Sequence, residues 1–252
     1  MNVRMTPQTR KTRAQVSLAR LLSKFGLASR SEAGGIIAAG RVKVNGVVVR
    51  SAERWIDPHA DRVMVDGRPL RPRQFVYIAM HKPAGVVTTR SDEHARPTVY
   101  RLLPDVGCRL FPVGRLDKET SGLLLFTNDT RFGERITSPD SGIAKTYVVQ
   151  LDIPLAEGHR RIMEEGMELR RGERLLPAQV VCRDGGRICE ITIREGRNRQ
   201  VRRMFAAFGY VVSSLHRTRI GPVTLGALAP GMVRPLLPGE IKTLNRHPEV
   251  GP

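Results

Sequence analysis

The sequence predicts an α+β protein, in which a small N-terminal module of two helices and a β-hairpin precedes a larger domain built on a mixed, largely antiparallel sheet. Three observations support this fold class. Apolar residues at helical spacing, followed by alternating valines, occupy residues 15–62. Beyond residue 74, short β-like runs outnumber helical stretches, and too few helices alternate with them for a doubly wound α/β fold. The chain shows no internal repeat or low-complexity tract.

The N-terminal module is expected to begin with a helix near Gln15 that ends at Gly26. Apolar side chains recur along it at helical spacing (Leu18, Leu21, Leu22 and Phe25). Ser29 and Glu32 form an S-x-x-E pattern that caps the start of a second helix, which ends at Gly40. Valines then flank Asn45-Gly46, a pair that suits the positive φ angles of a tight hairpin turn.

The larger domain is expected over residues 75–246, after a linker at 63–74 that contains two prolines and an Asp-Gly turn. The module and its linker thus occupy 15–74, with a flexible basic arm at 1–14 and a tail at 247–252. Four strands are expected in the larger domain, at Phe75–Met80, Leu123–Thr127, Thr146–Leu151 and Arg187–Ile193. Helices are expected at Thr130–Thr137 and Arg199–Phe208.

The charge balance indicates the partner. The chain has 42 Lys and Arg against 24 Asp and Glu, a formal net charge of +18. Such a charge repels itself unless a polyanion neutralises it, and phosphate backbones are the usual polyanion. An anionic membrane surface and a general effect on solubility are the alternatives. Arginine dominates the basic set, and its planar fork suits phosphates and bases, so we expect a nucleic-acid partner.

Other classes of protein are not indicated. No apolar run approaches the length that spans a bilayer, no basic amphipathic helix is long enough to lie on one, and the N-terminus lacks a signal-peptide core. The three cysteines, Cys108, Cys182 and Cys189, are an odd number without a C-x-x-C pair. We therefore expect neither a disulfide framework nor a zinc site, and a cytoplasmic location fits this usage.

The string from Gly114 to Thr127 carries the most specific chemistry. A polar turn with one Asp, Asp117, leads directly into an apolar run. A rigid strand end holds a carboxylate in a fixed position. Taken alone, an Asp between Leu and Lys is more often a turn former than a catalytic group, so the longer pattern decides.

That pattern, G-R-L-D-x-x-T-S-G-L-L, resembles the catalytic signature of the pseudouridine synthases, in particular the ribosomal-RNA enzymes of the RsuA/RluB kind that carry an N-terminal S4 domain. Three further segments resemble the same family: its K-P-x-G strand end at 81–85 (with His81 where Asn is commoner), its K-x-Y element at 145–147 and its G-R-N-R-Q-V-R-R-M element at 196–204. Residues 29–46 resemble the S4 pattern of an S-R-x-E-A helix followed by G-R-V-x-V-N-G. The resemblance runs from about Gln15 to Leu244.

The resemblance implies an isomerase that breaks the N1–C1′ bond of uridine, turns the uracil and rejoins it through C5. Nothing is oxidised, hydrolysed or added, so neither a cofactor nor a metal ion is implied. Asp117 would act as nucleophile or base, and whether it attacks the sugar, adds to the base or removes a proton stays open. Tyr147 would stack on the detached uracil. Arg202 would pair with Asp117, because burial alone favours the neutral acid and a cation opposes that.

RNA contacts are implied for further basic residues. Arg115 resembles the arginine that enters the RNA beside the target, since a paired base must flip out to reach the carboxylate at a cost of roughly a few kcal/mol. The other expected contacts are Arg30, Arg41, Lys43, Lys82 and Arg199. Each could equally be a solvated charge, Lys82 could support the pocket wall, and Tyr147 and Arg202 could be a core residue and a phosphate contact. A second basic patch at 216–219 is expected to bind phosphates.

The sequence therefore predicts an enzyme that converts one uridine of ribosomal RNA to pseudouridine, with large-subunit RNA preferred, and that acts as a monomer on structured RNA with an unpaired target. The alternative is a non-catalytic S4-containing RNA-binding or ribosome-assembly protein, which loss of Asp117, or of Tyr147 and Arg202 together, would favour. A hydrolase of RNA glycosidic bonds would need a second carboxylate close to the first. Glu119 is near Asp117 in sequence, but at a position that the family leaves variable.

Overall fold

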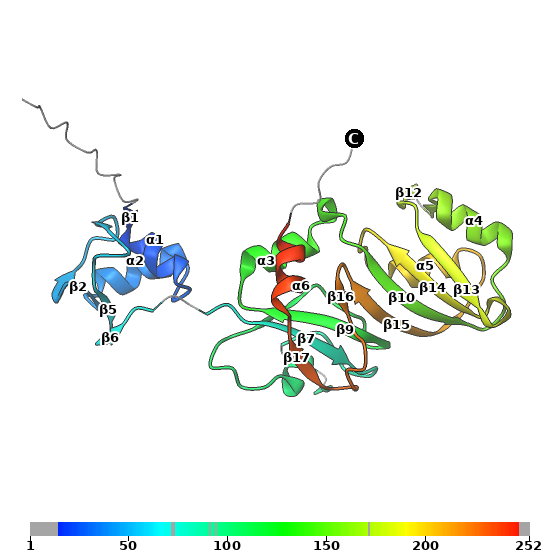
Figure 1. Ribbon diagram of the computed structural model, residues 1–252, viewed down its shortest axis with the longest axis horizontal. Coiled ribbons are helices and arrows are strands. Elements are labelled where there is room, and N and C mark those ends of the chain that lie inside the picture. The colour runs from blue at the N-terminus through cyan, green and yellow to red at the C-terminus, as the bar shows by residue number, and fades with distance from the viewer. Residues whose placement is uncertain (1–14, 72–73, 91, 94, 171, 247–252) are drawn as a thin grey trace, which may run out of the picture. The chain divides into compact units, whose positions relative to one another are not determined.

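The protein consists of two compact units that divide between Gln74 and Phe75 (Figure 1). The computed structural model describes residues 15–71, 74–90, 92–93, 95–170 and 172–246. The arm expected at 1–14 and the tail expected at 247–252 lie outside the described residues.

The N-terminal unit packs two helices, α1 (Leu18–Lys24) and α2 (Arg30–Ala38), on a four-stranded sheet. The strand order is β3 (Val47–Val49), β2 (Val42–Val44), β5 (Val63–Val65) and β6 (Arg68–Pro69), and a separate pair joins β1 (Val16–Ser17) to β4 (Trp55–Ile56). The capping box is confirmed, because Ser29 accepts from the Glu32 N–H and Glu32 accepts from the Ser29 N–H. The hairpin turn is confirmed too, with φ of 52° at Asn45 and 86° at Gly46.

The linker expected at 63–74 is wrong over its first half. Residues 63–65 pair with β2, and β6 closes the sheet. Pro69, one of the two prolines that suggested a linker, lies in β6, which is an edge strand. An edge strand tolerates proline because one side of it needs no ladder hydrogen bond.

The C-terminal unit is built on a nine-stranded sheet (Figure 1). Its main order is β13 (Gln179–Arg183), β14 (Ile188–Ile193), β10 (Lys145–Leu151), β15 (Val212–Ile220), β9 (Thr120–Thr127), β7 (Tyr77–Lys82) and β17 (Val233–Pro235). β8 (Phe111–Val113) pairs with β9, and β16 (Val223–Thr224) pairs with β15. All of these pairs are antiparallel except β15 with β9, so the expectation of a mixed, largely antiparallel sheet is confirmed.

Helices pack on both faces of the sheet, which separates two hydrophobic cores. Along β9, Leu124 and Phe126 enter the larger core, which also takes side chains from α4 (Glu157–Glu165) and α5 (Gln200–Ala206). Leu123 and Leu125 point to the other face, against α3 (Thr130–Thr137) and α6 (Pro238–Asn245). This alternation is the two-residue period of a strand buried on both faces. Among the residues that the structure describes, no helix is long and apolar enough to cross a membrane.

The remaining elements are short. They are the strand pair β11 (Glu168–Leu169) with β12 (Glu173–Arg174) and three 3-10 turns at Val99–Leu102, Pro139–Ser141 and Asp184–Gly186. The last of these turns links β13 to β14 and sets Cys182 opposite Cys189, where the two form a disulfide. The expectation of no disulfide is therefore wrong for these two cysteines. Their pairing depends on the hairpin register, which the seven-residue spacing does not reveal.

Candidate active site

Asp117 lies in the turn that joins β8 to β9. β8 ends at Val113, and the next residue, Gly114, has a φ of 78° that lets the chain leave the sheet sharply. The turn then closes when the Thr120 N–H donates to the Asp117 carbonyl oxygen at 3.1 Å. The Asp117 side chain is one-third exposed (33%), so its carboxylate faces a solvent-accessible cavity.

Lys82, at the end of β7, stabilises this turn through hydrogen bonds to its backbone. Its side chain is fully buried, and Nζ donates to the carbonyl oxygens of Thr120 at 2.7 Å, Pro83 at 2.9 Å and Lys118 at 3.3 Å. Burial is the main reason why the pKa of Lys82 is lowered to about 8, and the nearby carboxylates of Glu119 and Asp117 oppose that shift. The assignment of Lys82 as an RNA contact is therefore corrected: the ammonium group is enclosed and contacts the backbone of the turn.

Tyr147 and Arg217 are two buried residues that line the cavity. Tyr147 comes from β10 and is 8% exposed, and Arg217 comes from the neighbouring β15 and is 4% exposed. The Arg217 guanidinium lies 5.9 Å from the centre of the Tyr147 ring, and its Nη1 donates to the Tyr147 hydroxyl at 3.4 Å. Its Nε donates to the Leu123 carbonyl oxygen at 2.7 Å. The tyrosine is thus held in place from one side by a buried cation.

The glycine of the S-G-L-L string explains how Arg217 reaches the cavity. Gly122 pairs with Arg217 in the parallel β9–β15 contact, at a φ of 107°. A Cβ at position 122 would lie 2.6 Å from the Arg217 backbone nitrogen and would overlap the carbonyl oxygen as well. Only glycine allows the two strands to approach this closely.

Arg199 forms an ion pair with Asp117: its Nη1 lies 3.8 Å from the Asp117 carboxylate and 4.0 Å from that of Glu119. Arg199 has a left-handed backbone, with φ of 47°, immediately before α5. The ion pair expected between Arg202 and Asp117 does not form among the described residues. Arg202 lies one turn into α5, where Nη1 donates to the Val212 carbonyl oxygen at 2.9 Å.

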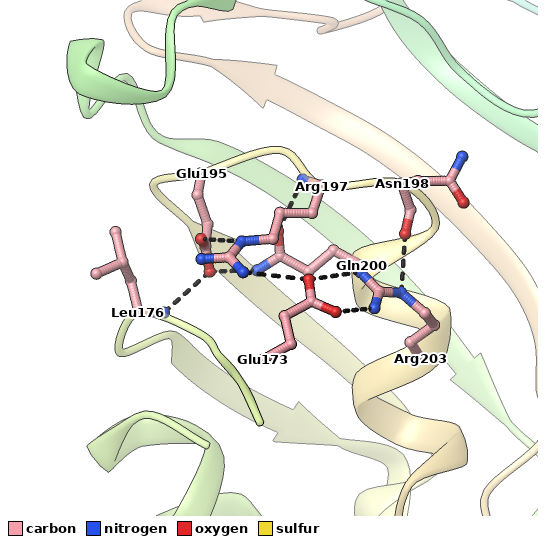
Figure 2. A network of polar contacts seen from close by, with 7 residues as sticks. All are labelled: Glu173, Leu176, Glu195, Arg197, Asn198, Gln200 and Arg203. Atoms are coloured by element: carbon pink, nitrogen blue, oxygen red, sulfur yellow. Dashed lines mark hydrogen bonds and ion pairs between the residues drawn. The ribbon is translucent and has the colours of Figure 1, made fainter. Parts of the chain in front are cut away.

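A network of polar contacts fixes the loop that carries Arg199 (Figure 2). Glu195, 5% exposed, accepts from the Gln200 side chain at 2.7 Å, the Leu176 N–H at 2.9 Å and Arg197 Nε at 2.9 Å. Glu173, in β12, is bonded to Arg197 and to Arg203. Hydrogen bonds from Arg203 and Arg197 lower the pKa of Glu173 to about 2. Two arginines of the basic motif are therefore already neutralised within the protein.

The cavity beside Asp117 has a volume of about 580 Å³. Asp117, Tyr147, Arg199 and Arg217 all line it, together with exposed Arg115 at its mouth. Lys145 lines it too, and burial, followed by the charge of Arg217, lowers the pKa of Lys145 to about 8. The lining of the cavity thus holds five cationic side chains and one carboxylate, Asp117; the cations are Arg115, Lys145, Arg197, Arg199 and Arg217.

The expected RNA contacts of the N-terminal unit differ in their surroundings. Arg30, the first residue of α2, and Lys43, on β2, are exposed. Arg41 forms a two-point ion pair with Asp66, in which Nε donates to the carboxylate at 2.8 Å. An RNA contact by Arg41 would have to compete with that carboxylate.

Sequence reasoning missed two roles. Arg217 was expected in a surface phosphate patch, but the alternation along β15 turns it inward with Leu215 while His216 faces the other side. A strand assigned to 212–220 would have indicated this. Glu195, the one acid in the basic motif, was not singled out, although a lone carboxylate among arginines is itself a sign of an internal partner. Within the ranges described, no three His, Cys, Asp or Glu side chains gather to hold a metal ion.

Comparisons with known proteins agree with this geometry. Residues 76–207 match the family described as RNA pseudouridylate synthase, and residues 16–61 match the S4 domain. The chain is 38% identical to "Ribosomal large subunit pseudouridine synthase B" of Bacillus subtilis, over 90% of this chain and 95% of that protein. It is 40% identical to "Ribosomal small subunit pseudouridine synthase A" of Escherichia coli, over 86% of this chain and 94% of that protein. A solved structure titled "Crystal structure of pseudouridylate synthase" is similar with a TM-score of 0.64 and 35% identity, over 91% of this chain and 99% of that one.

Proposed function

Because the chain belongs to the RNA pseudouridylate synthase family and carries an S4 domain, we propose that it isomerises one uridine of ribosomal RNA to pseudouridine with Asp117 as the catalytic carboxylate. The single observation that carries this proposal is the placement of Asp117 at the cavity, opposite Arg199 and together with Tyr147. An ionised carboxylate beside a cation is available as a nucleophile or base.

The other lining residues fit the steps of the reaction. Tyr147 offers a flat surface for the uracil when it is detached from the sugar. Arg115 stands at the mouth of the cavity, where it can occupy the space that the flipped nucleotide leaves in the RNA. Arg199 pairs with Asp117 in the role that the sequence assigned to Arg202.

The substrate is proposed to be ribosomal RNA, bound through the N-terminal S4 unit and the basic surface of the catalytic unit. The Bacillus subtilis and Escherichia coli relatives described above are named for different ribosomal subunits, at similar identity. Large-subunit RNA is our first choice of substrate. Because the relatives are named for both subunits, the test includes both RNAs. A ribosomal RNA substrate would place the enzyme in the cytoplasm.

The test is release of tritium from transcripts of large- and small-subunit RNA labelled at uridine C5. C5 loses its hydrogen only when it becomes the new glycosidic carbon. We expect release by the wild type and none by Asp117→Asn. The matched control is Asp140→Asn, an exposed aspartate in the turn at 139–141, which should release tritium at the wild-type rate.

Three outcomes would contradict parts of the proposal. Equal release by Asp117→Asn would remove Asp117 from the chemistry. Free uracil among the products would point to hydrolysis. No release by the wild type from either RNA, or from ribosomal particles, would favour a non-catalytic RNA-binding protein.

A further inference from the structure

Two residues that line the cavity each carry a buried polar atom without a hydrogen-bond partner. Among the residues that the structure describes, three buried side-chain nitrogen or oxygen atoms form no hydrogen bond: Arg217 Nη2, Thr120 Oγ1 and Arg202 Nε. Arg217 and Thr120 both line the cavity that contains Asp117. A buried donor without an acceptor costs about 1–3 kcal/mol, and native proteins rarely leave one unless it has a use.

The two groups lie on the same face of the sheet. Gly122 pairs with Arg217 and Leu215 pairs with Thr120, and side chains two residues apart along a strand share a face. Arg217 cannot turn away from the cavity easily, because Nε is bonded to Leu123 and Nη1 to Tyr147. Its remaining nitrogen, Nη2, is thus presented as a fixed donor beside the tyrosine ring.

The electrostatics of the cavity favour an anionic guest. Lys145, Arg199 and Arg217 outnumber the one lining carboxylate, Asp117. The lowered pKa of Lys145 is the expected response to burial near another cation. A group that gains negative charge inside this cavity would be stabilised without any rearrangement of the protein.

We infer that Arg217, with Thr120 beside it, is a catalytic residue that binds the uracil while it is detached and negatively charged. This inference rests on the proposed function. When the C1′–N1 bond breaks, its electron pair stays on the ring, and the charge spreads over N1 and the carbonyl oxygens. Arg217 Nη2 donates to one of these oxygens, and Thr120 Oγ1 donates to or accepts from the ring edge. The charge is consumed when C5 attacks C1′, the C5 proton leaves and N1 takes up a proton.

The test compares Arg217→Gln and Arg217→Lys with wild type in single-turnover tritium release at saturating enzyme, alongside filter-binding measurements of RNA affinity. We expect Arg217→Gln to lower the rate constant by at least ~100-fold, the usual effect of deleting one donor to a developing anion. RNA affinity should change by less than about threefold, because the group contacts only the flipped base. Arg187→Gln is the matched control, because Arg187 is an exposed arginine immediately before β14 that does not line the cavity, and it should leave both quantities unchanged.

A second substrate separates charge stabilisation from a structural role. RNA with 5-fluorouridine at the target carries a ring that bears negative charge more easily. Because its C5 carries no hydrogen to release, the reaction is followed as the loss of 5-fluorouridine from nuclease digests of the RNA, and the variant's deficit in that rate should be at least about tenfold smaller than for uridine. Equal deficits on both substrates, or an unchanged rate constant in folded Arg217→Gln, would overturn the inference. If Arg217→Gln does not fold, Arg217→Lys is compared on the same two substrates with the same criterion. Failure of the wild type on every ribosomal RNA would instead reject the proposed function.

Discussion

Glu195 offers the sharpest test of the network that supports the site. In Glu195→Gln one acceptor oxygen becomes an NH2 group that faces donors from Leu176, Gln200 or Arg197. Losing one hydrogen bond to a charged group costs about 1.5–3 kcal/mol, and the buried donor left without an acceptor adds about 1–3 kcal/mol. We take about 3 kcal/mol as the loss in the free energy of unfolding. For a unit of this size it lowers Tm by roughly 6–12 °C.

The same substitution should slow the reaction well below its Tm. The Glu195 carboxylate ties Gln200 and Arg197 together on either side of Arg199, whose left-handed backbone depends on that support. We expect single-turnover tritium release to fall about tenfold with RNA affinity unchanged. The control is Glu168→Gln, which removes an exposed ion pair with Arg174 at 3.5 Å and should shift Tm by no more than about 2 °C. A Glu195→Gln protein with wild-type Tm and rate would refute the reasoning.

Three further predictions concern residues in and around the cavity. Gly122→Ala places a Cβ against the Arg217 backbone and should lower Tm by more than about 10 °C in thermal unfolding. The control is Gly158→Ala, whose added Cβ has no neighbouring atom within 4 Å and should leave Tm within about 2 °C of the wild type. The pKa of Lys82 is about 8 in the folded protein, below the ordinary lysine value of 10.5, so the unfolded chain binds more protons between these pH values. The free energy of unfolding of the wild type, measured in urea titrations, should therefore rise relative to that of Lys82→Met as the pH rises from about 8 to 10.5. A difference between the two proteins that does not change with pH would contradict the lowered pKa of Lys82. Arg199→Gln should lower the tritium-release rate at least about tenfold with Tm unchanged, whereas Arg202→Gln should act mainly on Tm; the reverse pattern would restore Arg202 as the partner of Asp117.

The N-terminal unit could be predicted in detail because its signals are local. The Ser29–Glu32 box and the Asn45-Gly46 turn each involve residues within four positions of one another, and the structure confirms both. The linker prediction was wrong because β5 is defined by pairing with β2, about twenty residues away, and β6 by pairing with β5, and neither by its own composition. Prolines at a sheet edge and prolines in a linker look alike in sequence.

The C-terminal unit was predicted in outline, and its active-site residues only in part. The turn with Asp117 is continuous in sequence, so a motif can identify it. β15 is not identifiable in this way, because its mostly polar residues form a strand through pairing with β9 and β10, which are distant in sequence. The choice between Arg199 and Arg202 depends on one positive φ angle, which a motif of alternating arginines does not encode.

The pairing of β9 with β15 explains why the T-S-G part of the Asp117 string extends beyond the turn that carries Asp117. Asp117 alone needs only a fixed turn, which Lys82 already supplies by holding the carbonyl oxygens of Lys118 and Thr120. Thr120 and Gly122 face β15, where one presents a hydroxyl to the cavity and the other admits the Arg217 backbone. The string therefore specifies the carboxylate and also the close contact between β9 and β15 that positions the buried Arg217. A substitution at position 122 should consequently act on the reaction through Arg217, although the glycine itself touches no substrate.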